Sequence, residues 1–187
     1  MILFISRLEA DKRVDLLLDA FKIVANQRPG AKLAIIGRGE EEQALRDRTG
    51  RLGLSDRVIF PGAIYDEMQL APWFLSAACM AYPVAIGLSV LHAFGYRLPV
   101  VTSDDIASHN PEIEALRDGE NGLLYRDGDV GDFAAKMLMC MNDTEVRRRM
   151  SDAALLTVGE PDGFCIPRMV RGFVEAIAYA RSRQAQM

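Results

Sequence analysis

Two cations near the start of the sequence have a spacing that suits a diphosphate. Arg7 and Lys12 follow a short apolar run at residues 2–5 and have four residues between them. Both side chains can therefore overhang one crevice, because one leaves the end of a strand and the other lies near the start of a helix. Paired cations beside the free amides of a helix N-terminus bind a diphosphate well. Ordinary solvated charges are the alternative interpretation.

A second possible anion site lies at Gly87 and Leu88, which open a helix directly after an apolar strand. Free amides and the positive end of a helix dipole would meet there. His92 follows one and a half turns into that helix, where a lone histidine in apolar surroundings is more often a satisfied core residue than a ligand. His109 stands in a polar loop beside Asn110, and its default interpretation is a solvated loop residue.

No self-contained catalytic or metal-binding pattern is present. The two histidines are far apart, and neither Asp nor Glu occurs between Met68 and Ser103, so we expect no metal site. The cysteines lack an evident base partner, and the G-x-S-x-G motif of hydrolases is absent. The Gly-Arg-Gly segment at 37–39 lacks the third glycine of a dinucleotide fingerprint and the lysine of a P-loop. It is interpreted as a tight strand-to-helix turn.

Composition narrows the class of protein. The chain has 187 residues, half of them hydrophobic and 26% charged, as in one soluble globular domain. The net charge of -4 argues against a nucleic-acid partner, which needs a basic face. Three widely spaced cysteines fit a cytoplasmic location. The stretch from Met68 to Tyr96 has no formally charged side chain, but prolines and glycines interrupt it. It is therefore interpreted as a buried helix–strand–helix passage rather than a membrane span.

Short apolar runs alternate with amphipathic stretches, which predicts strand–helix units around a parallel sheet. Strands are expected at 2–6, 32–36, 58–60, 79–82, 99–102 and 122–125. Helices are expected from residue 14 to the Pro-Gly at 29–30, and at 40–52, 66–77, 87–95, 129–141, 144–158 and 167–182. The whole chain, 1–187, is thus expected to be one doubly wound, Rossmann-like α/β domain with about six strands, helices on both faces and a helical C-terminal tail. In the tail, the residues expected to face inward are Val170, Phe173, Val174 and Ile177.

That fold class places a ligand beyond the carboxyl ends of the strands, at the topological switch point. The loops expected there are 6–12, 37–40, 62–66, 83–87 and 103–111, and glycines cluster in them. Backbone amides in such loops can approach an anion closely.

Taken in order, the motifs resemble the C-terminal, donor-binding domain of glycosyltransferase family 4, the group 1 glycosyltransferases of GT-B architecture. The resemblance runs from Ile5 to about Asp143 and depends on the ordered set rather than on one motif. The matching pieces are Ser6-Arg7-Leu8 with Lys12, KLAIIGRG at 32–39, LGLSDRVIFPG at 52–62, Gly87-Leu88, Leu91-His92-Ala93, Pro99-Val100-Val101 and DGENGLL at 118–124.

The resemblance implies a retaining, metal-independent transferase that uses a UDP- or GDP-linked sugar as its substrate and needs no cofactor. The residues that would hold the donor diphosphate are Arg7, Lys12, Gly87 and Leu88. The residues whose backbone would contact the base are Gly62, Ala63 and Ile64. Surface-polysaccharide or glycoconjugate synthesis is the process that such a transferase would serve.

One departure from the family concerns its two glutamates, which are separated by seven residues. Those positions hold Val84 and His92 here. A ring nitrogen of His92 can still bond the donor ribose, whereas Val84 cannot hydrogen-bond the sugar. Sugar contacts must then come from elsewhere or be lost. The candidates for such contacts are His109, Asn110 and Glu112.

A second departure is length. Enzymes of this family have two domains, and the N-terminal half supplies the acceptor site and usually a basic catalytic residue. This sequence starts at the first strand of the second half, so we expect donor binding without efficient transfer, and no catalytic residue is assigned. Any peripheral membrane association would belong to the absent half. Because the last helix of the family packs on that half, the apolar face around Val170, Phe173 and Ile177 would be partly exposed here.

Two other function classes stay open. The first is a non-catalytic nucleotide-binding or interaction module that has lost the chemistry, which Val84 and His92 favour. The second is a sugar-nucleotide epimerase of the same architecture, against which the missing carboxylates count.

Overall fold

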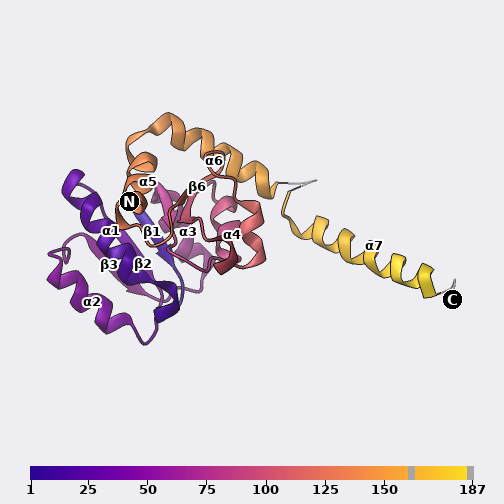
Figure 1. The fold of residues 1–187 in the computed structure, drawn as a ribbon, viewed down its shortest axis with the longest axis horizontal. Helices are drawn as coiled ribbons and strands as arrows, with labels where there is room; N and C mark the ends of the chain where they lie inside the picture. The colour runs from indigo at the N-terminus through magenta and orange to yellow at the C-terminus, as the bar shows by residue number, and fades with distance from the viewer. Residues whose placement is uncertain (160–162, 185–187) are drawn as a thin grey trace.

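A computed structural model of the chain describes residues 1–159 and 163–184. At its centre lies a parallel sheet (Figure 1). Its six strands have the order β3-β2-β1-β4-β5-β6. The strands are β1 (Ile2–Ile5), β2 (Leu33–Ile36), β3 (Val58–Gly62), β4 (Cys79–Ala81), β5 (Val100–Ser103) and β6 (Gly122–Tyr125). The order reverses between β1 and β4, which makes their carboxyl ends the topological switch point.

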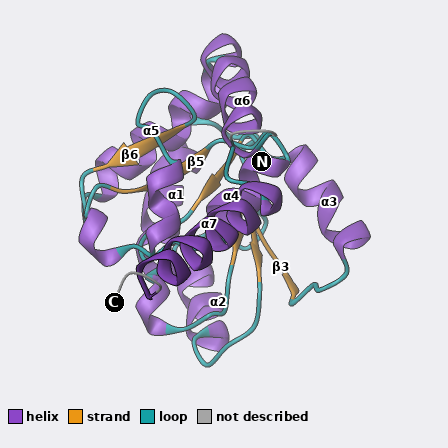
Figure 2. Cartoon of the chain, turned by 90° about the vertical axis from the view of Figure 1, so that its right-hand side faces the viewer, coloured by secondary structure: helices purple, strands orange, loops and turns teal. Residues whose placement is uncertain are grey.

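Helices cover both faces of the sheet (Figures 1 and 2). The helices of the domain body are α1 (Val14–Gln27), α2 (Glu42–Arg51), α3 (Glu67–Ser76), α4 (Ser89–Gly95), α5 (Val130–Asn142) and α6 (Thr144–Val158), and a further helix, α7 (Ile166–Gln184), follows them. Helix α1 packs against α5, and α4 packs against α6. The predicted doubly wound α/β class and the helical C-terminal segment are confirmed.

Side-chain caps account for the start of α3 and of α5. The side chain of Asp66 accepts hydrogen bonds from the second and third amides of α3, and Asp129 caps α5 in the same way. Strand β3 runs through Pro61 to Gly62, although the proline predicted an end at Phe60. The prediction was wrong because β3 is an edge strand, where a missing N–H need not break the ladder.

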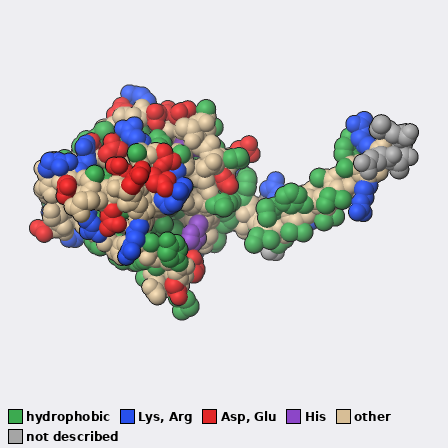
Figure 3. Space-filling model, turned by 90° about the horizontal axis from the view of Figure 1, so that it is seen from below, with side chains coloured by type: hydrophobic (Ala, Val, Ile, Leu, Met, Phe, Trp, Pro, Cys, Tyr) green, Lys and Arg blue, Asp and Glu red, His purple; other side chains and the backbone are tan. Residues whose placement is uncertain are grey.

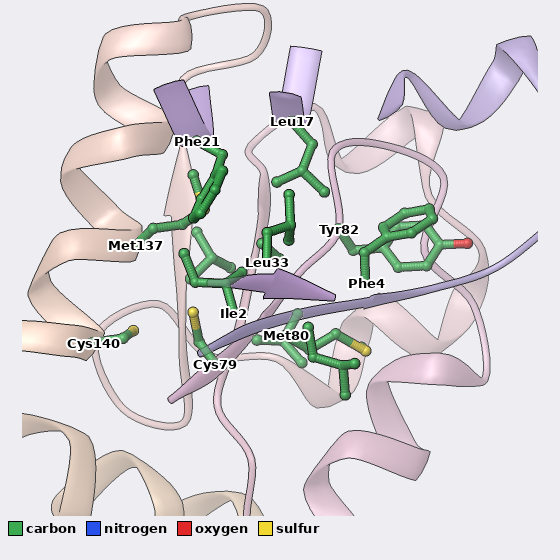
Figure 4. Packing of buried hydrophobic residues seen from close by; sticks show 14 of the residues in the cluster. Ile2, Phe4, Leu17, Phe21, Leu33, Cys79, Met80, Tyr82, Met137 and Cys140 are labelled. Carbon is green, nitrogen blue, oxygen red and sulfur yellow. The ribbon is translucent and has the colours of Figure 1, made fainter. Parts of the chain in front are cut away.

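The core lies around the central strands. Residues Ile2 to Phe4 and all of β2 have no exposed surface, because a parallel sheet is covered on both faces. The ring centroids of Phe4 and Tyr82 are 5.2 Å apart, and the same region holds the buried thiols of Cys79 and Cys140 (Figure 4).

The uncharged stretch from Met68 to Tyr96 becomes most of α3, then β4 and α4, as predicted. In the described residues, no helix combines the length and apolar character needed to cross a membrane.

Helix α7 departs from the sequence prediction. It leaves the body of the domain and projects into solvent (Figure 1), and apolar side chains lie along it (Figure 3). Phe173 is 64% exposed, and Val170, Val174 and Ile177 are also exposed. The prediction that these residues face inward is wrong, because helical periodicity identifies an apolar face without identifying what covers it. The expectation of partial exposure is confirmed.

Candidate functional site

At the switch point, the loop after β1 is fixed to its neighbours by short contacts. The Tyr82 hydroxyl, just beyond β4, donates to Ser6 Oγ at 2.8 Å. The Gly-Arg-Gly segment at 37–39 lies directly against residues 6–8, with Leu8 N donating to the Arg38 carbonyl at 2.9 Å. A Cβ atom at Gly37 would lie 1.8 Å from the Ser6 carbonyl oxygen. Close backbone approach explains the glycines at both ends of this segment.

A cavity of about 250 Å³ opens at the carboxyl ends of β1, β2 and β3. Its lining residues are Ile5, Ser6, Arg7, Ile36, Gly37, Arg38, Ala63, Ile64 and Tyr65. Three residues predicted for the donor site, Arg7, Ala63 and Ile64, are thus brought together here. The adjacent Gly62 accepts a hydrogen bond from Gly37 N at 3.0 Å and keeps the β3 loop beside the β2 loop.

Sequence reasoning missed two side chains in this cavity, Arg38 and Tyr65. Tyr65 is 93% exposed, and Arg38 is exposed as well. A phenol ring and a guanidinium plane both present flat faces on which a nucleobase can stack. The available signals were an arginine between two glycines and an aromatic residue directly after the predicted base loop. The arginine was interpreted only as part of a turn, and the aromatic residue was not interpreted at all.

The two cations among the predicted phosphate ligands, Arg7 and Lys12, are each paired with a carboxylate. Arg7 Nη1 lies 2.7 Å from Glu9 Oε1, and its side chain is 73% exposed. Lys12 Nζ lies 2.9 Å from Asp11 Oδ2, but only 13% of its side chain is exposed. The structure brings Arg7 into the cavity and leaves Lys12 outside its lining. An exposed ion pair contributes about 0–1 kcal/mol, so a phosphate can displace Glu9 from Arg7 at little cost.

Gly87 and Leu88 precede α4, which begins at Ser89 rather than at Gly87 as predicted. The shift arises because the first hydrogen bond of the turn, from Val90 N to Gly87 O, leaves Gly87 and Leu88 ahead of the regular helix. Among the described residues, no acceptor binds the amides of Gly87 and Leu88. They remain available for an anion, as the predicted phosphate contact requires.

The structure assigns His109 to a structural position. Its Nδ1 accepts from Ile86 N at 3.1 Å, and its Nε2 donates to the Ser103 carbonyl at 3.0 Å. Asn110 N also donates to the Ile86 carbonyl at 3.0 Å. The default interpretation of His109 as a solvated loop residue is therefore wrong. Its ring fastens the 83–88 loop to the end of β5, and both ring nitrogens are occupied in this conformation.

The other candidate sugar contacts lie close to the same loop. The Asn110 Nδ2 atom would be 2.9 Å from a Cβ atom at Gly87, so its amide covers that glycine. Glu112 lies in the 3-10 turn Pro111–Ala115, and its Oε2 is buried with no hydrogen-bond partner in the described part of the chain. At the other motif position, Val84 is followed by Ala85, whose φ of 55° is left-handed.

His92 points toward α3 and contacts a carboxylate that the sequence did not reveal. Its Nε2 lies 2.9 Å from Glu67 Oε1, and the Tyr96 hydroxyl donates to the same oxygen. The His92 ring is 4.6 Å from that of Phe74, and 41% of its side chain is exposed. The interpretation as a core histidine is wrong about burial, although the ring does have a partner. Hydrogen bonds from Tyr96 and His92 hold the pKa of Glu67 below its usual value.

Possible metal ligands are dispersed. Within residues 1–159 and 163–184, no three His, Cys, Asp or Glu side chains gather in a way that could hold a metal ion.

The family follows from comparison of the whole chain with known proteins. Residues 1–143 match the family model "Glycosyl transferases group 1". The chain belongs to this family. It is 30% identical over 187 residues to the phosphatidyl-myo-inositol mannosyltransferase of Mycobacterium leprae, covering 97% of this chain and 48% of that protein.

Solved glycosyltransferase structures share the fold. HepE of Anabaena in complex with UDP matches with a TM-score of 0.81 at 22% identity, over 95% of this chain and 48% of that one. The C-terminal domain of LpcC, a group 1 glycosyltransferase of Francisella tularensis, matches with a TM-score of 0.71 at 21% identity, over 82% of each chain. The group 1 chain described here spans half or less of the length of the first curated relatives that it matches.

Proposed function

We propose that this chain binds a nucleotide sugar, UDP- or GDP-linked, as the donor half of a retaining, metal-independent glycosyltransferase. The observation that carries the proposal is the cavity at the carboxyl ends of β1–β3. It combines an exposed arginine, Arg7, with the backbone of Ala63 and Ile64 and the flat side chains of Arg38 and Tyr65. A base between Tyr65 and the β3 loop would direct its diphosphate toward Arg7 and the switch point.

The amides before α4 supply the other side of the diphosphate site. Gly87 and Leu88 follow β4, the strand next to β1, so they and Arg7 flank the same switch point. Membership of the group 1 family and the presence of UDP in the HepE structure both support a nucleotide-sugar donor. The names of several relatives, such as a lipopolysaccharide core biosynthesis glycosyltransferase, support a role in polysaccharide or glycoconjugate synthesis.

Transfer itself would require parts that the donor half does not supply. We infer that the acceptor site and a basic catalytic residue are supplied by an N-terminal half of the kind that the longer relatives have room for. On its own, the 187-residue chain should bind donor and show little transfer. Any association with a membrane surface would belong to that other half, and the assembled enzyme would act in the cytoplasm.

A non-catalytic nucleotide-binding module is the second candidate function, and specific observations favour it. Val84 offers the sugar no hydrogen bond, and both nitrogens of His109 are bound to backbone. A module of this kind would bind the nucleotide without making specific contacts with the sugar.

A thermal-shift panel separates the two functions. We would measure the melting temperature of the chain with UDP, GDP and ADP and with their common sugar conjugates. Ligand at 100 times its dissociation constant adds about 2.7 kcal/mol, which is roughly 5–10 °C for a domain of this size. The donor domain predicts a shift with one nucleotide and a further gain with one of its sugar conjugates. Equal shifts with and without sugar would indicate the non-catalytic module, and a flat panel would contradict both.

A further inference from the structure

The contact between α3 and α4 lies where the proposed site needs a ribose contact. Helix α3 begins at Glu67, two residues after Tyr65 on the wall of the cavity. Helix α4 has Leu88 as its N-cap and carries His92 about one turn further on. A nucleoside diphosphate with its base at the β3 loop and its phosphates at the start of α4 must place its ribose between these elements. The bond from His92 to Glu67 joins the two elements across that gap.

The three polar groups at this contact have different roles. Glu67 is 57% exposed and receives both hydrogen bonds, from His92 and from Tyr96, on a single oxygen, Oε1. Because a carboxylate only accepts, His92 Nε2 must carry the proton that it donates. The two donors also lower the pKa of Glu67, so its carboxylate is anionic at neutral pH. Within the described residues, no donor binds Oε2.

A ribose presents two neighbouring hydroxyl groups, and a carboxylate held in place by other donors is a strong acceptor for them. His92 cannot take that role through Nε2, because this nitrogen already donates to Glu67. In that tautomer His92 Nδ1 is an acceptor as well, but it is neutral, so the anionic carboxylate on α3 is the stronger acceptor for ribose hydroxyls. Phe74 and Tyr96 keep this arrangement rigid, because their rings stack with centroids 4.7 Å apart and the His92 ring packs against Phe74.

We propose that Glu67 binds the ribose hydroxyls of the nucleotide and that His92 and Tyr96 are positioning residues that hold its carboxylate. This inference rests on the proposed function, since it assigns the ribose contact of the same nucleotide site. It changes the expected role of His92 from a direct ligand to a support. It also makes the site selective for ribonucleotides over deoxyribonucleotides, because a sugar without these hydroxyls leaves Glu67 without its ligand donors.

The test combines a substitution of Glu67 with removal of the ribose hydroxyls from the ligand, and compares the resulting affinities. Binding of UDP and GDP, and of their 2′,3′-dideoxy forms, is measured by calorimetry on the 187-residue chain and on Glu67→Gln. The unaltered chain should bind the ribonucleotide about tenfold or more tightly than its dideoxy form, as expected for hydrogen bonds to a charged group. Glu67→Gln should lose that preference by weakening ribonucleotide binding, with dideoxy binding changed less than twofold.

Two further variants make the result specific. Glu145→Gln is the matched control, because Glu145 is also an exposed first-turn glutamate whose pKa is lowered, in its case by Arg148 on α6. It should leave both affinities unchanged. Tyr96→Phe keeps the carboxylate and removes one of its supports, so it should reduce the ribose preference without abolishing it. Circular dichroism melts confirm that each variant is folded.

Other outcomes overturn the inference in distinguishable ways. Equal weakening of both ligands in Glu67→Gln would show that Glu67 only supports the fold of the site. An unaltered chain that binds ribonucleotide and dideoxynucleotide equally well would remove the ribose contact while leaving the proposed function intact. If the unaltered chain binds none of these nucleotides, the proposed function fails, and this inference fails with it.

Discussion

The loops after β1 and β4 flank the same switch point but are built from different chemistry. Residues 6–13 carry five formal charges and are fixed mainly by backbone contacts with residues 37–39. Residues 83–88 carry none. One backbone bond, from Asn110 N to the Ile86 carbonyl, and two side chains fix them: the His109 ring and the Tyr125 hydroxyl, which donates to the Pro83 carbonyl at 2.9 Å. The first loop can contact an anion with charged side chains, and the second can contact it with backbone amides. A diphosphate between them would use both, and the loops should respond differently to substitution.

The largest loss of stability is expected at Gly37, where the backbone of the β2 loop packs directly against the backbone of the β1 loop. Gly37→Ala would place a Cβ atom 1.8 Å from the Ser6 carbonyl oxygen, and φ at Gly37 is +152°. We expect a loss of about 3 kcal/mol in the free energy of unfolding, because the β1 and β2 loops must separate. Gly30→Ala is the control, since no atom lies within 4 Å of its added Cβ, and it should change stability by about 0.5 kcal/mol or less. Urea denaturation of both variants measures the difference.

If the two variants were equally stable, close packing of the loop after β1 would not be what fixes it.

Removing charge from the loop after β1 should affect binding rather than folding. Arg7→Ala and Lys12→Ala are each expected to weaken nucleoside diphosphate binding by about 1–3 kcal/mol, the range for charge-assisted hydrogen bonds. Arg126→Ala is the matched control, because Arg126 is 76% exposed and paired with Asp129 in the loop after β6, the far edge strand. Calorimetry with UDP and GDP gives the affinities.

Unchanged affinity in both Arg7→Ala and Lys12→Ala would place the diphosphate elsewhere. Because Lys12 is largely buried beside Asp11, a loss of affinity in Arg7→Ala alone would restrict the charged contact to the cavity.

Removing the His109 ring, which holds the loop after β4, should lower the stability of the domain. His109→Ala leaves Ile86 N and the Ser103 carbonyl without their partner, at an expected cost of about 1–3 kcal/mol. His92→Ala is the comparison, because its bond to Glu67 is exposed and should contribute about 1 kcal/mol or less. Thermal melts rank the two variants. A smaller loss for His109→Ala than for His92→Ala would contradict the anchoring role.

The smallest effect tests backbone strain in the loop after β4. Ala85 has a φ of 55°, a conformation that costs a non-glycine residue about 1–2 kcal/mol. Ala85→Gly should therefore raise stability by about 1 kcal/mol once the entropy of the unfolded glycine is included. Ala107→Gly, in the nearby turn Ile106–Ser108, has no positive φ to relieve and should lower stability. A melting temperature that falls in both variants would show that Ala85 is not strained.

Local signals in the sequence predicted the fold well and the site only in part. Apolar runs and the caps Asp66 and Asp129 are properties of neighbouring residues, so strands and helices were found close to their true ends. The pairing of His92 with Glu67 joins residues 25 apart on different helices, and no local pattern encodes it.

The remaining errors have the same origin. A glycine-flanked arginine signals a turn, but its place in the cavity depends on how β1, β2 and β3 align. The apolar face of α7 is exposed because no described part of the domain covers it, and hydrophobic periodicity in the sequence does not show what covers a helix face. The grouping of Arg7 with Ala63 and Ile64 was predictable because a parallel sheet gathers the ends of its strands at one edge.

The positions of the three thiols mean that their rates of chemical modification can measure local opening of the domain. Cys79 and Cys140 are fully buried, and the pKa of the Cys79 thiol is raised by its hydrogen bond to Cys140 and by burial, whereas Cys165 is partly exposed. Only the thiolate reacts readily with a thiol reagent. One cysteine should therefore be modified quickly, and the other two only as fast as the sheet separates from α5. The rate of the slow phase would measure how often the sheet and α5 separate, without any added label.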